Sequence, residues 1–164
     1  MLVYKFLRPG AVGPFSGLAW PVGEWMEAPG ALALCRSGIH ACRVRDLPYW
    51  ITEELWRIEL EGEVVEEEKI VLGQRGRLVE RVSGWTRDTA LDFARACAER
   101  AGSLGDARGY ADHALQLADA ARDGSFDVVP TTAYVAAHAG PYTNERSWQA
   151  RWLEERLGLQ PARA

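Results

Sequence analysis

The sequence predicts an α+β fold, in which a small, mainly antiparallel sheet in the N-terminal half packs against a helical C-terminal half. Before Trp85, large and polar side chains alternate in short segments that glycine and proline separate, as in strands joined by turns. After Trp85, apolar residues recur every three or four positions and alanine is abundant, as in helices. We therefore expect a β-rich half at residues 1–84 and a helical half at residues 85–164, together forming one integrated domain.

The N-terminal half contains several short strand candidates. Residues 2–8 alternate large and polar groups and end at a Pro-Gly pair. Residues 9–30 hold four prolines and five glycines, so we expect a loop, which Trp20 and Trp25 hold in place by packing. The other elements predicted here are strands at residues 31–35, 39–42, 54–60, 69–72 and 76–83, a turn at 36–38, a short helix at 46–52 and a solvated acidic turn at 61–68.

Helical spacing and end signals predict four helices in the second half. They run from Thr86 to Gly102, along the face marked by Tyr110, Ala114, Leu117 and Ala121, from Pro130 to Gly140, and from a cap at Asn144 to Gly158. Trp148 and Trp152 lie four residues apart on one face of the last helix. We interpret them as a core stripe that docks this helix onto the sheet, the alternative being an exposed anchor for a partner.

Composition excludes several classes of protein. Net charge is −4 over 164 residues, which disfavours nucleic acid as a partner, and no apolar run is long enough to cross a membrane. Only two of the 19 basic residues are lysines, an arginine bias typical of high-GC genomes such as those of actinobacteria. Three cysteines and no secretory leader predict a cytoplasmic protein with reduced thiols. A monomer and a homodimer are both compatible with this composition.

The segment from Cys35 to Cys42 is the most unusual part of the chain. On a strand, His40 and Cys42 point to the same face, and Cys35 could return to it across the turn. Thiolate and imidazole are ligands that zinc prefers, so a zinc site is one interpretation. A fourth ligand would then come from the helical half, where Cys97, His113 and His138 are the candidates.

Two further interpretations of this segment remain open. Cys35 and Cys42 can be small buried residues around a hydrogen-bonded His40, with no cofactor at all. Alternatively, Cys42 could act as a nucleophile beside His40, although neighbours on one strand diverge from the geometry of such a pair. The sequence contains none of the standard nucleophile-elbow, phosphate-loop, dinucleotide or zinc-protease motifs.

Three groups of residues carry a resemblance to a known family. These are Tyr4-Lys5-x-Leu7, Cys35-x-x-Gly38-Ile39-His40-x-Cys42 and Leu55-Trp-x-Ile58-Glu-x-x-Gly62. They resemble a family of uncharacterised bacterial and phage proteins, some of which also carry pentapeptide repeats. The helix with Glu145-Arg146-x-Trp148-Gln149 is similar to the tails of the same family. The resemblance implies a shared fold and marks Gly38 and His40 as important positions, but it implies no activity.

A second, fainter similarity is to small ADP-ribosyltransferase-like folds. Those folds also begin with a strand that carries a basic residue and continue with a Gly-Ile strand and a short helix. The similarity would implicate Arg8, His40 and either Glu59 or Glu80.

These observations favour a non-catalytic module that binds a small molecule or a protein in a cleft near residues 35–42. The candidate ligand-binding residues are Trp20, Trp25, Arg36, His40 and Arg43. Arg36, Arg43 and Arg45 cluster around His40, so an anion would bind there. The alternative is an enzyme centred on His40, either a transferase or a metal-assisted enzyme, with zinc as its cofactor.

Overall fold

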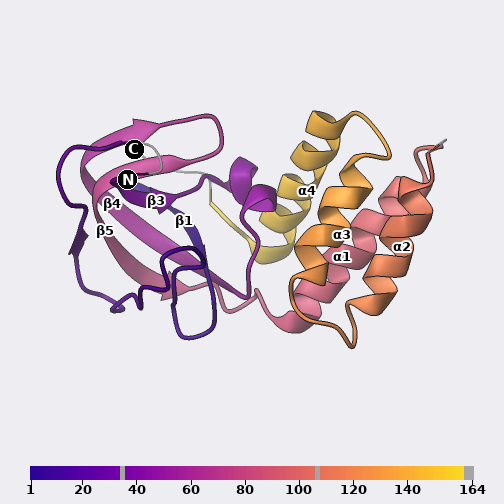
Figure 1. Cartoon of the computed structure of the whole chain (residues 1–164), viewed down its shortest axis with the longest axis horizontal. Coiled ribbons are helices and arrows are strands. Elements are labelled where there is room, and N and C mark those ends of the chain that lie inside the picture. Colours follow the sequence, from indigo (N-terminus) through magenta and orange to yellow (C-terminus); the bar gives the residue numbers. More distant parts are fainter. Residues whose placement is uncertain (34–35, 106–107, 161–164) are drawn as a thin grey trace. The chain divides into compact units, whose positions relative to one another are not determined.

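A computed structural model describes residues 1–33, 36–105 and 108–160. The chain divides into two compact units. The sheet unit comprises Met1–Ser83 with the chain from Leu159, and the helical unit comprises Gly84–Gly158. The predicted α+β fold is confirmed, since the described residues form an antiparallel sheet of five strands followed by four α-helices (Figure 1). That the two halves form one integrated domain stays a prediction.

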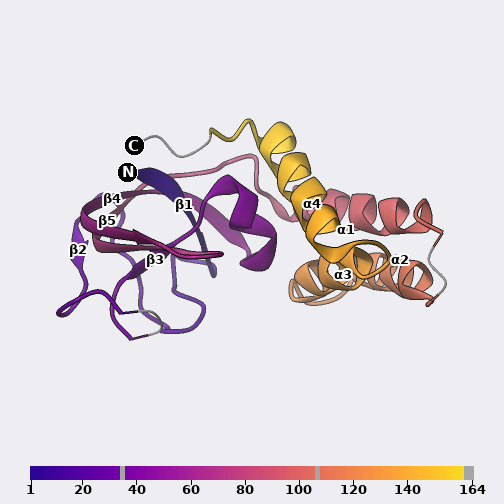
Figure 2. The same ribbon diagram turned by 90° about the horizontal axis from the view of Figure 1, so that it is seen from above.

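Three strands form the body of the sheet, with the order β1 (Leu2–Leu7), β4 (Glu54–Glu66), β5 (Val71–Arg81). The short strands β2 (Met26–Glu27) and β3 (Ile39–Ala41) both pair with the free edge of β5. Directly after β3, Cys42 exchanges two backbone hydrogen bonds with Tyr4 of β1, at 2.8 and 2.9 Å. The sheet therefore curls until β3 meets β1 (Figure 2).

The inner face of the curled sheet holds the core of this unit. Val3 and Leu7 of β1 belong to one buried cluster with Ile58 of β4 and Leu78 of β5. Gly76 of β5 lies opposite Leu60, and a Cβ atom at Gly76 would lie only 2.5 Å from Cγ2 of Ile39. The inner face is therefore too crowded at this point for any side chain, which is why the strand carries glycine there.

The structure corrects the sequence prediction for the acidic stretch at residues 61–68. Residues 61–66 continue β4 instead of forming a turn, and the turn is confined to residues 67–70. Val64 and Val65 pair with Gly73 and Leu72 of β5. Glu61 pairs across the strands with Arg75 at 2.9 Å, so the arginines of β5 compensate the acidic charge. The separate strands predicted at 69–72 and 76–83 are one strand, β5.

Two other predictions for this unit need adjustment. Leu34 and Cys35 of the predicted strand 31–35 lie outside the described residues, and Ala33 makes only an isolated bridge to Ser37. The helix predicted at 46–52 is a 3₁₀ helix, η1 (Val44–Tyr49). Pro48 lies inside it, and proline disfavours the longer α-helix because it has no backbone N–H to donate.

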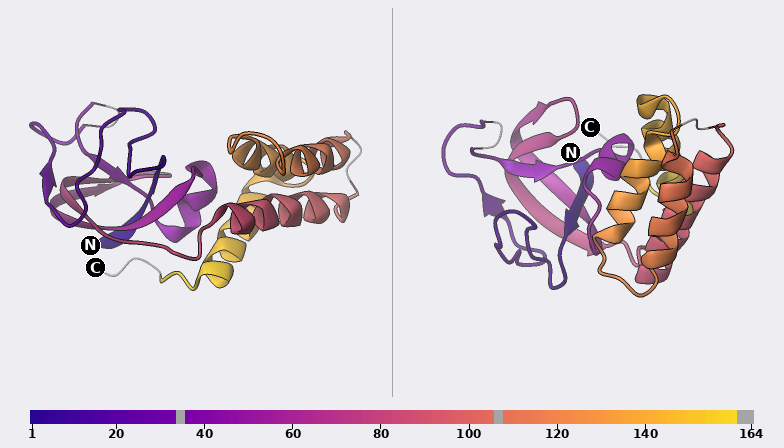
Figure 3. Two further views of the ribbon diagram at one scale, coloured as in Figure 1. Left: turned by 90° about the horizontal axis from the view of Figure 1, so that it is seen from below. Right: turned by 45° about the vertical axis from the view of Figure 1, so that its right-hand side comes forward.

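The helical unit contains α1 (Arg87–Gly102), α2 (Tyr110–Ala120), α3 (Val128–Ala137) and α4 (Tyr142–Leu157). The first three pack pairwise through alanine-rich faces (Figure 3). The Thr86 hydroxyl caps α1 by accepting a hydrogen bond from the Thr89 N–H at 3.2 Å, at the residue where the sequence predicted the helical pattern to begin. Gly158 ends α4 in the left-handed conformation, also as predicted. None of the helices that the structure describes is both long and apolar enough to cross a bilayer.

Two helix starts differ from the prediction. Helix α3 begins at Val128 and not at Pro130, because a proline fits anywhere in the first turn, where backbone N–H groups have no helical partner. Helix α4 begins at Tyr142, and Pro141 occupies the cap position. Asn144 therefore lies inside the first turn and does not cap the helix.

Trp148 and Trp152 attach α4 to α1. The ring of Trp152 lies 5.4 Å from that of Phe93, and the Arg100 guanidinium lies 5.0 Å from the ring of Trp148. Both tryptophans are half-buried. The contacts described for these two tryptophans are thus made within the helical unit, whereas the sequence analysis expected contacts with the sheet.

Candidate functional site

All the ligand-binding residues predicted from the sequence lie in the sheet unit, but the structure separates them. Trp20 and His40 both contact Lys5 of β1, a residue that the sequence analysis did not select. Trp25 packs on the arginines of β5, and Arg43 belongs to an ion-pair network. We refer to Lys5, Trp20 and His40 as the Lys5 site.

Lys5 reaches the inner side of the sheet from β1. It lies on the same face of the strand as Val3 and Leu7, which are fully buried, so its stem shares their apolar surroundings. The ammonium donates a hydrogen bond to the backbone oxygen of His40 at 2.5 Å and lies 4.9 Å from the centre of a Trp20 ring. Burial lowers the pKa of Lys5 to about 8, because the apolar surroundings disfavour the charged form.

His40 lies on β3 with its imidazole half-buried. Burial and, to a smaller extent, the charge of Lys5 lower the pKa of His40, so its ring is neutral at pH 7. Nε2 of this ring is buried and makes no hydrogen bond with the described part of the chain. A buried polar atom in that state is uncommon in folded proteins and indicates a position that a ligand or water can fill.

Cys42 has a structural environment. It is buried, and its thiol donates to the backbone oxygen of Tyr4, with 3.5 Å between Sγ and the oxygen. Burial raises the pKa of Cys42 to about 12. The thiol is therefore protonated at neutral pH, which disfavours both nucleophilic attack and metal binding by this residue.

The zinc interpretation stays a prediction. Cys35 lies outside the described residues, and the described ones contain no group of three His, Cys, Asp or Glu residues that could hold a metal ion. The proposed fourth ligands belong to the helical unit. Cys97 is buried on α1, His113 is exposed on α2, and His138 packs against Tyr134 and Tyr142 at the end of α3.

Arg43 is held by acceptors of its own unit. Its guanidinium donates to the carboxylates of Asp46 and Glu66, at 2.5 and 2.8 Å, and to the backbone oxygens of Glu67 and Glu68. These bonds tie η1 to the end of the β4–β5 hairpin. Arg36 and Arg45 are exposed. Arg43, the most buried arginine of the predicted cluster, thus has a structural role.

Trp25 also has partners on the sheet. The guanidinium groups of Arg75 and Arg77 lie 5.0 and 4.8 Å from the centre of its ring. These arginines in turn form ion pairs with Glu61 and Glu59 of β4. Trp25 therefore fixes the loop before β2 on β5, as the sequence analysis expected for its packing.

Of the residues that the ADP-ribosyltransferase similarity implies, Arg8 and Glu59 lie at opposite ends of β1. Arg8 follows the end of β1, whereas Glu59 pairs with Leu2 at the beginning of that strand. Glu59 forms an ion pair with Arg77, and Glu80 forms one with Arg57. The strand register thus places Arg8 and Glu59 about 20 Å apart, at roughly 3.3 Å per residue.

Glu54 is a buried acid that the sequence analysis missed. Its carboxylate accepts hydrogen bonds from the N–H groups of Gly10 and Ala11 and from the indole of Trp56, and it forms an ion pair with Arg81. Burial alone would raise the pKa of Glu54, but these hydrogen bonds and the Arg81 charge lower it overall. The carboxylate therefore stays charged and fastens the loop after β1.

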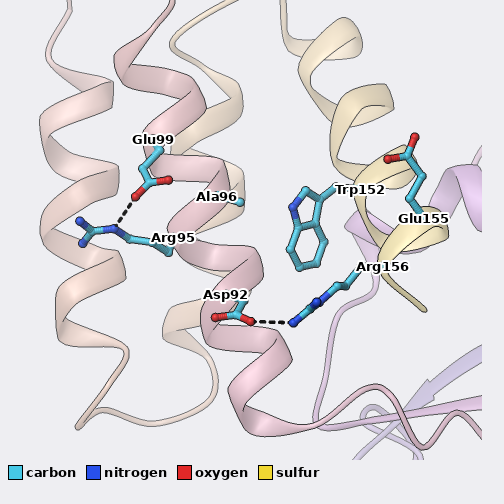
Figure 4. A pocket seen from close by; sticks show the side chains of 7 residues that line it. All are labelled: Asp92, Arg95, Ala96, Glu99, Trp152, Glu155 and Arg156. Atoms are coloured by element: carbon cyan, nitrogen blue, oxygen red, sulfur yellow. Dashed lines mark hydrogen bonds and ion pairs between the residues drawn. The ribbon is translucent and has the colours of Figure 1, made fainter. Parts of the chain in front are cut away.

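An open groove of about 580 Å³ lies between α1 and α4 (Figure 4). Trp152 forms one wall, and Ala96 and five charged side chains form the rest. Most of these charges compensate one another, since Asp92 pairs with Arg156 at 3.0 Å and Arg95 with Glu99 at 2.9 Å. The groove consequently has four of its five charged side chains in ion pairs with one another.

Comparison with known proteins assigns the sheet unit to a family. The model of a domain of unknown function, DUF7666, matches residues 1–86, which include the strands of the sheet unit and the Lys5 site. No curated protein and no solved structure shows significant similarity to the chain. The match agrees with the expected resemblance to an uncharacterised family, while the family's bacterial and phage range and the resemblance of the last helix stay predictions. The chain belongs to the DUF7666 family.

Proposed function

We propose that the sheet unit is a non-catalytic recognition module that binds a small anionic molecule at the Lys5 site. The observation that carries this proposal is the buried Nε2 atom of His40, for which the described residues provide no hydrogen-bond partner. It belongs to the same residue whose backbone oxygen holds the Lys5 ammonium. The ammonium lies on the inner side of the sheet with Ile39 and Ala41, whereas the His40 ring lies on the other face of β3, so the two groups flank the same strand.

These groups favour an anionic ligand. Leaving a buried polar atom without a partner costs about 1–3 kcal/mol, which a ligand that bonds to it would recover. Lys5 supplies a positive charge in apolar surroundings, where attraction to an anion is stronger than in water. A small carboxylate is suited to either group, since it carries a negative charge and accepts hydrogen bonds. The positive charge comes from Lys5, whereas the sequence analysis looked to Arg36 and Arg43.

The cell compartment and assembly are part of the same proposal. We place the module in the cytoplasm, on the sequence evidence and because Cys42 and Cys97 are free thiols. It acts as a monomer or homodimer. A protein partner, in place of a small molecule, is the outcome favoured if no small anion binds.

Isothermal titration calorimetry with acetate, glycolate and inorganic phosphate tests the proposal. We expect at least one of these probes to bind the full chain, and Lys5→Met and His40→Phe each to weaken that binding about tenfold or more, as expected for loss of a charged hydrogen bond. Lys69→Met is the matched control, because Lys69 is the other lysine and its side chain is 43% exposed. No binding by any probe, or equal weakening by the control, would contradict the proposal.

A further inference from the structure

We propose that the face of α4 with Trp148, Arg151, Trp152 and Glu155 joins two copies of this chain into a two-fold symmetric dimer. In that dimer, Arg151 of each copy enters the groove between α1 and α4 of the other copy. The inference concerns the helical unit and is independent of the anion site in the sheet unit. It selects the homodimer, where the sequence left a monomer and a homodimer open.

The four residues form one stripe along α4. They are spaced three or four positions apart, so the helix places them side by side. Arg151 and Glu155 are exposed, and the two tryptophans beside them are only half-buried. Tryptophan and arginine are enriched among the residues that supply most of the binding energy of protein interfaces. The composition of the stripe is therefore that of a contact surface.

Arg151 and Glu155 are the unpaired charges of this stripe. Neither forms an ion pair or a side-chain hydrogen bond with the residues that the structure describes. They lie one turn apart, but an arginine that precedes a glutamate is the less favourable order for a pair within a helix. A second copy offers each of them a partner, because two opposite charges on one surface complement themselves about a two-fold axis.

The groove beside the stripe has a place for the guanidinium of Arg151. Three carboxylates and two guanidinium groups line the groove, and Glu155 is the carboxylate that has no ion pair with a described residue. Figure 4 shows the ring of Trp152 between the two helices, opposite Ala96. A guanidinium that enters the groove pairs with Glu155 and packs against the indole. The volume of about 580 Å³ accommodates a whole arginine side chain.

An antiparallel pair of α4 helices brings these groups together. When Arg151 faces Glu155 of the second copy, the two-fold axis passes at the level of Leu153, midway between the two residues. Trp152 lies one residue from that level, so the two indoles are offset by only about 3 Å along the helix, at a rise of roughly 1.5 Å per residue. The interface thus has an aromatic centre with a reciprocal ion pair on each side.

Charge reversal in the full chain tests the dimer. We expect sedimentation velocity over a concentration series to show a species of twice the 18.2 kDa monomer. Arg151→Glu and Glu155→Arg each place like charges opposite one another, and each should weaken dimerisation about tenfold or more. Arg122→Glu is the matched control, because Arg122 is exposed in the turn after α2 and should leave dimerisation unchanged.

Mixing the two single variants gives the sharpest result. One variant then presents two carboxylates and the other two guanidinium groups, so both ion pairs of the mixed dimer have opposite charges. We expect the mixture to form a heterodimer as tight as the wild-type dimer, although each variant alone is weakened. Both positions are exposed, so the variants should fold, which circular dichroism checks.

Three results would overturn the inference. A wild-type chain that stays monomeric would exclude the second copy and favour a basic segment of another protein as the occupant of the groove. Single variants that dimerise like the wild type would show that the contact lies elsewhere. Folded variants whose mixture stays monomeric would exclude the pairing of Arg151 with Glu155.

Discussion

At the scale of single residues, Lys5 could have been identified from the sequence, but its partners could not. The alternation of residues 2–7 places Lys5 on the same side of the strand as Val3 and Leu7, which marks it as a lysine that faces the core. Its acceptor is the backbone oxygen of His40, 35 residues away. That contact exists because the sheet curls until the chain after β3 meets β1, and no local pattern encodes this closure.

The lowered pKa of Lys5 predicts a pH dependence of stability. Between pH 8 and the ordinary lysine pKa, the unfolded chain binds more protons at this residue than the folded chain, so stability rises with pH. From pH 8 to pH 9 the free energy of unfolding should rise by about 1 kcal/mol in the wild type relative to Lys5→Met. Urea titrations at both pH values measure this difference, and parallel changes in the two proteins would contradict the lowered pKa.

Arg43 predicts a second effect at this scale. Replacing it with methionine leaves the carboxylate of Asp46, whose side chain is 5% exposed, without its closest cation. We expect Arg43→Met to lower the free energy of unfolding by about 3 kcal/mol, as for a broken buried ion pair. Arg45→Met is the control, since Arg45 is 71% exposed and 3.9 Å from Asp46, and should change stability by less than about 0.5 kcal/mol. Similar losses in both variants would argue against a structural role specific to Arg43.

At the scale of elements, the alternation of the sequence predicted β1 and the start of β4 correctly. It missed the end of β4 and divided β5 into two separate strands. Glycine at positions 73 and 76 weakens the strand signal of β5, because glycine has a low strand propensity. In the structure those glycines are required by the packing of Leu60 and Ile39 on the inner face. Local propensity and tertiary packing therefore point in opposite directions at these positions.

The packing at Gly76 gives a prediction for β5. Gly76→Ala would place a methyl group 2.5 Å from Ile39, and we expect it to lower the free energy of unfolding by about 2 kcal/mol through overpacking. Gly102→Ala at the end of α1 is the matched control, because beyond its chain neighbours and its own helix backbone no heavy atom lies within 4 Å of the position of its Cβ. It should leave stability unchanged or raise it by less than about 1 kcal/mol. Chemical denaturation compares the two. Equal effects would show that crowding does not explain the glycine.

The helix ends show where sequence signals suffice. The change of period at Thr86 predicted where α1 begins, and Thr86 caps it. For α4 the sequence predicted a cap at Asn144, whereas the helix begins at Tyr142 and Pro141 occupies the cap position. Thr86→Ala should lower the free energy of unfolding by about 1 kcal/mol. Asn144→Ala should change it by less than about 0.5 kcal/mol, because the side chain makes no capping bond. Thermal unfolding of both variants checks the assignment, and the opposite order of losses would refute it.

At the scale of the whole molecule, the family match and the division into units coincide. DUF7666 covers residues 1–86, and the sheet unit comprises Met1–Ser83 with the chain from Leu159. The Tyr4 hydroxyl bonds to the backbone of Gln160, so the end of the described chain returns to β1 after the helical unit. Composition and period predicted a change of pattern near Trp85, and the two units divide between Ser83 and Gly84. The return of residues 159–160 could not be predicted, because it depends on a contact 156 residues apart.

The three histidines are distributed so that they report on this division. His40 belongs to the Lys5 site in the sheet unit, whereas His113 and His138 belong to the helical unit. Ring resonances in NMR spectra of the full chain during a titration with acetate therefore test the central claim most directly. We predict that the His40 resonances shift to saturation, that those of His113 and His138 stay in place, and that Lys5→Met removes the effect. Unchanged His40 resonances, or equal shifts of all three rings, would contradict anion recognition at the Lys5 site.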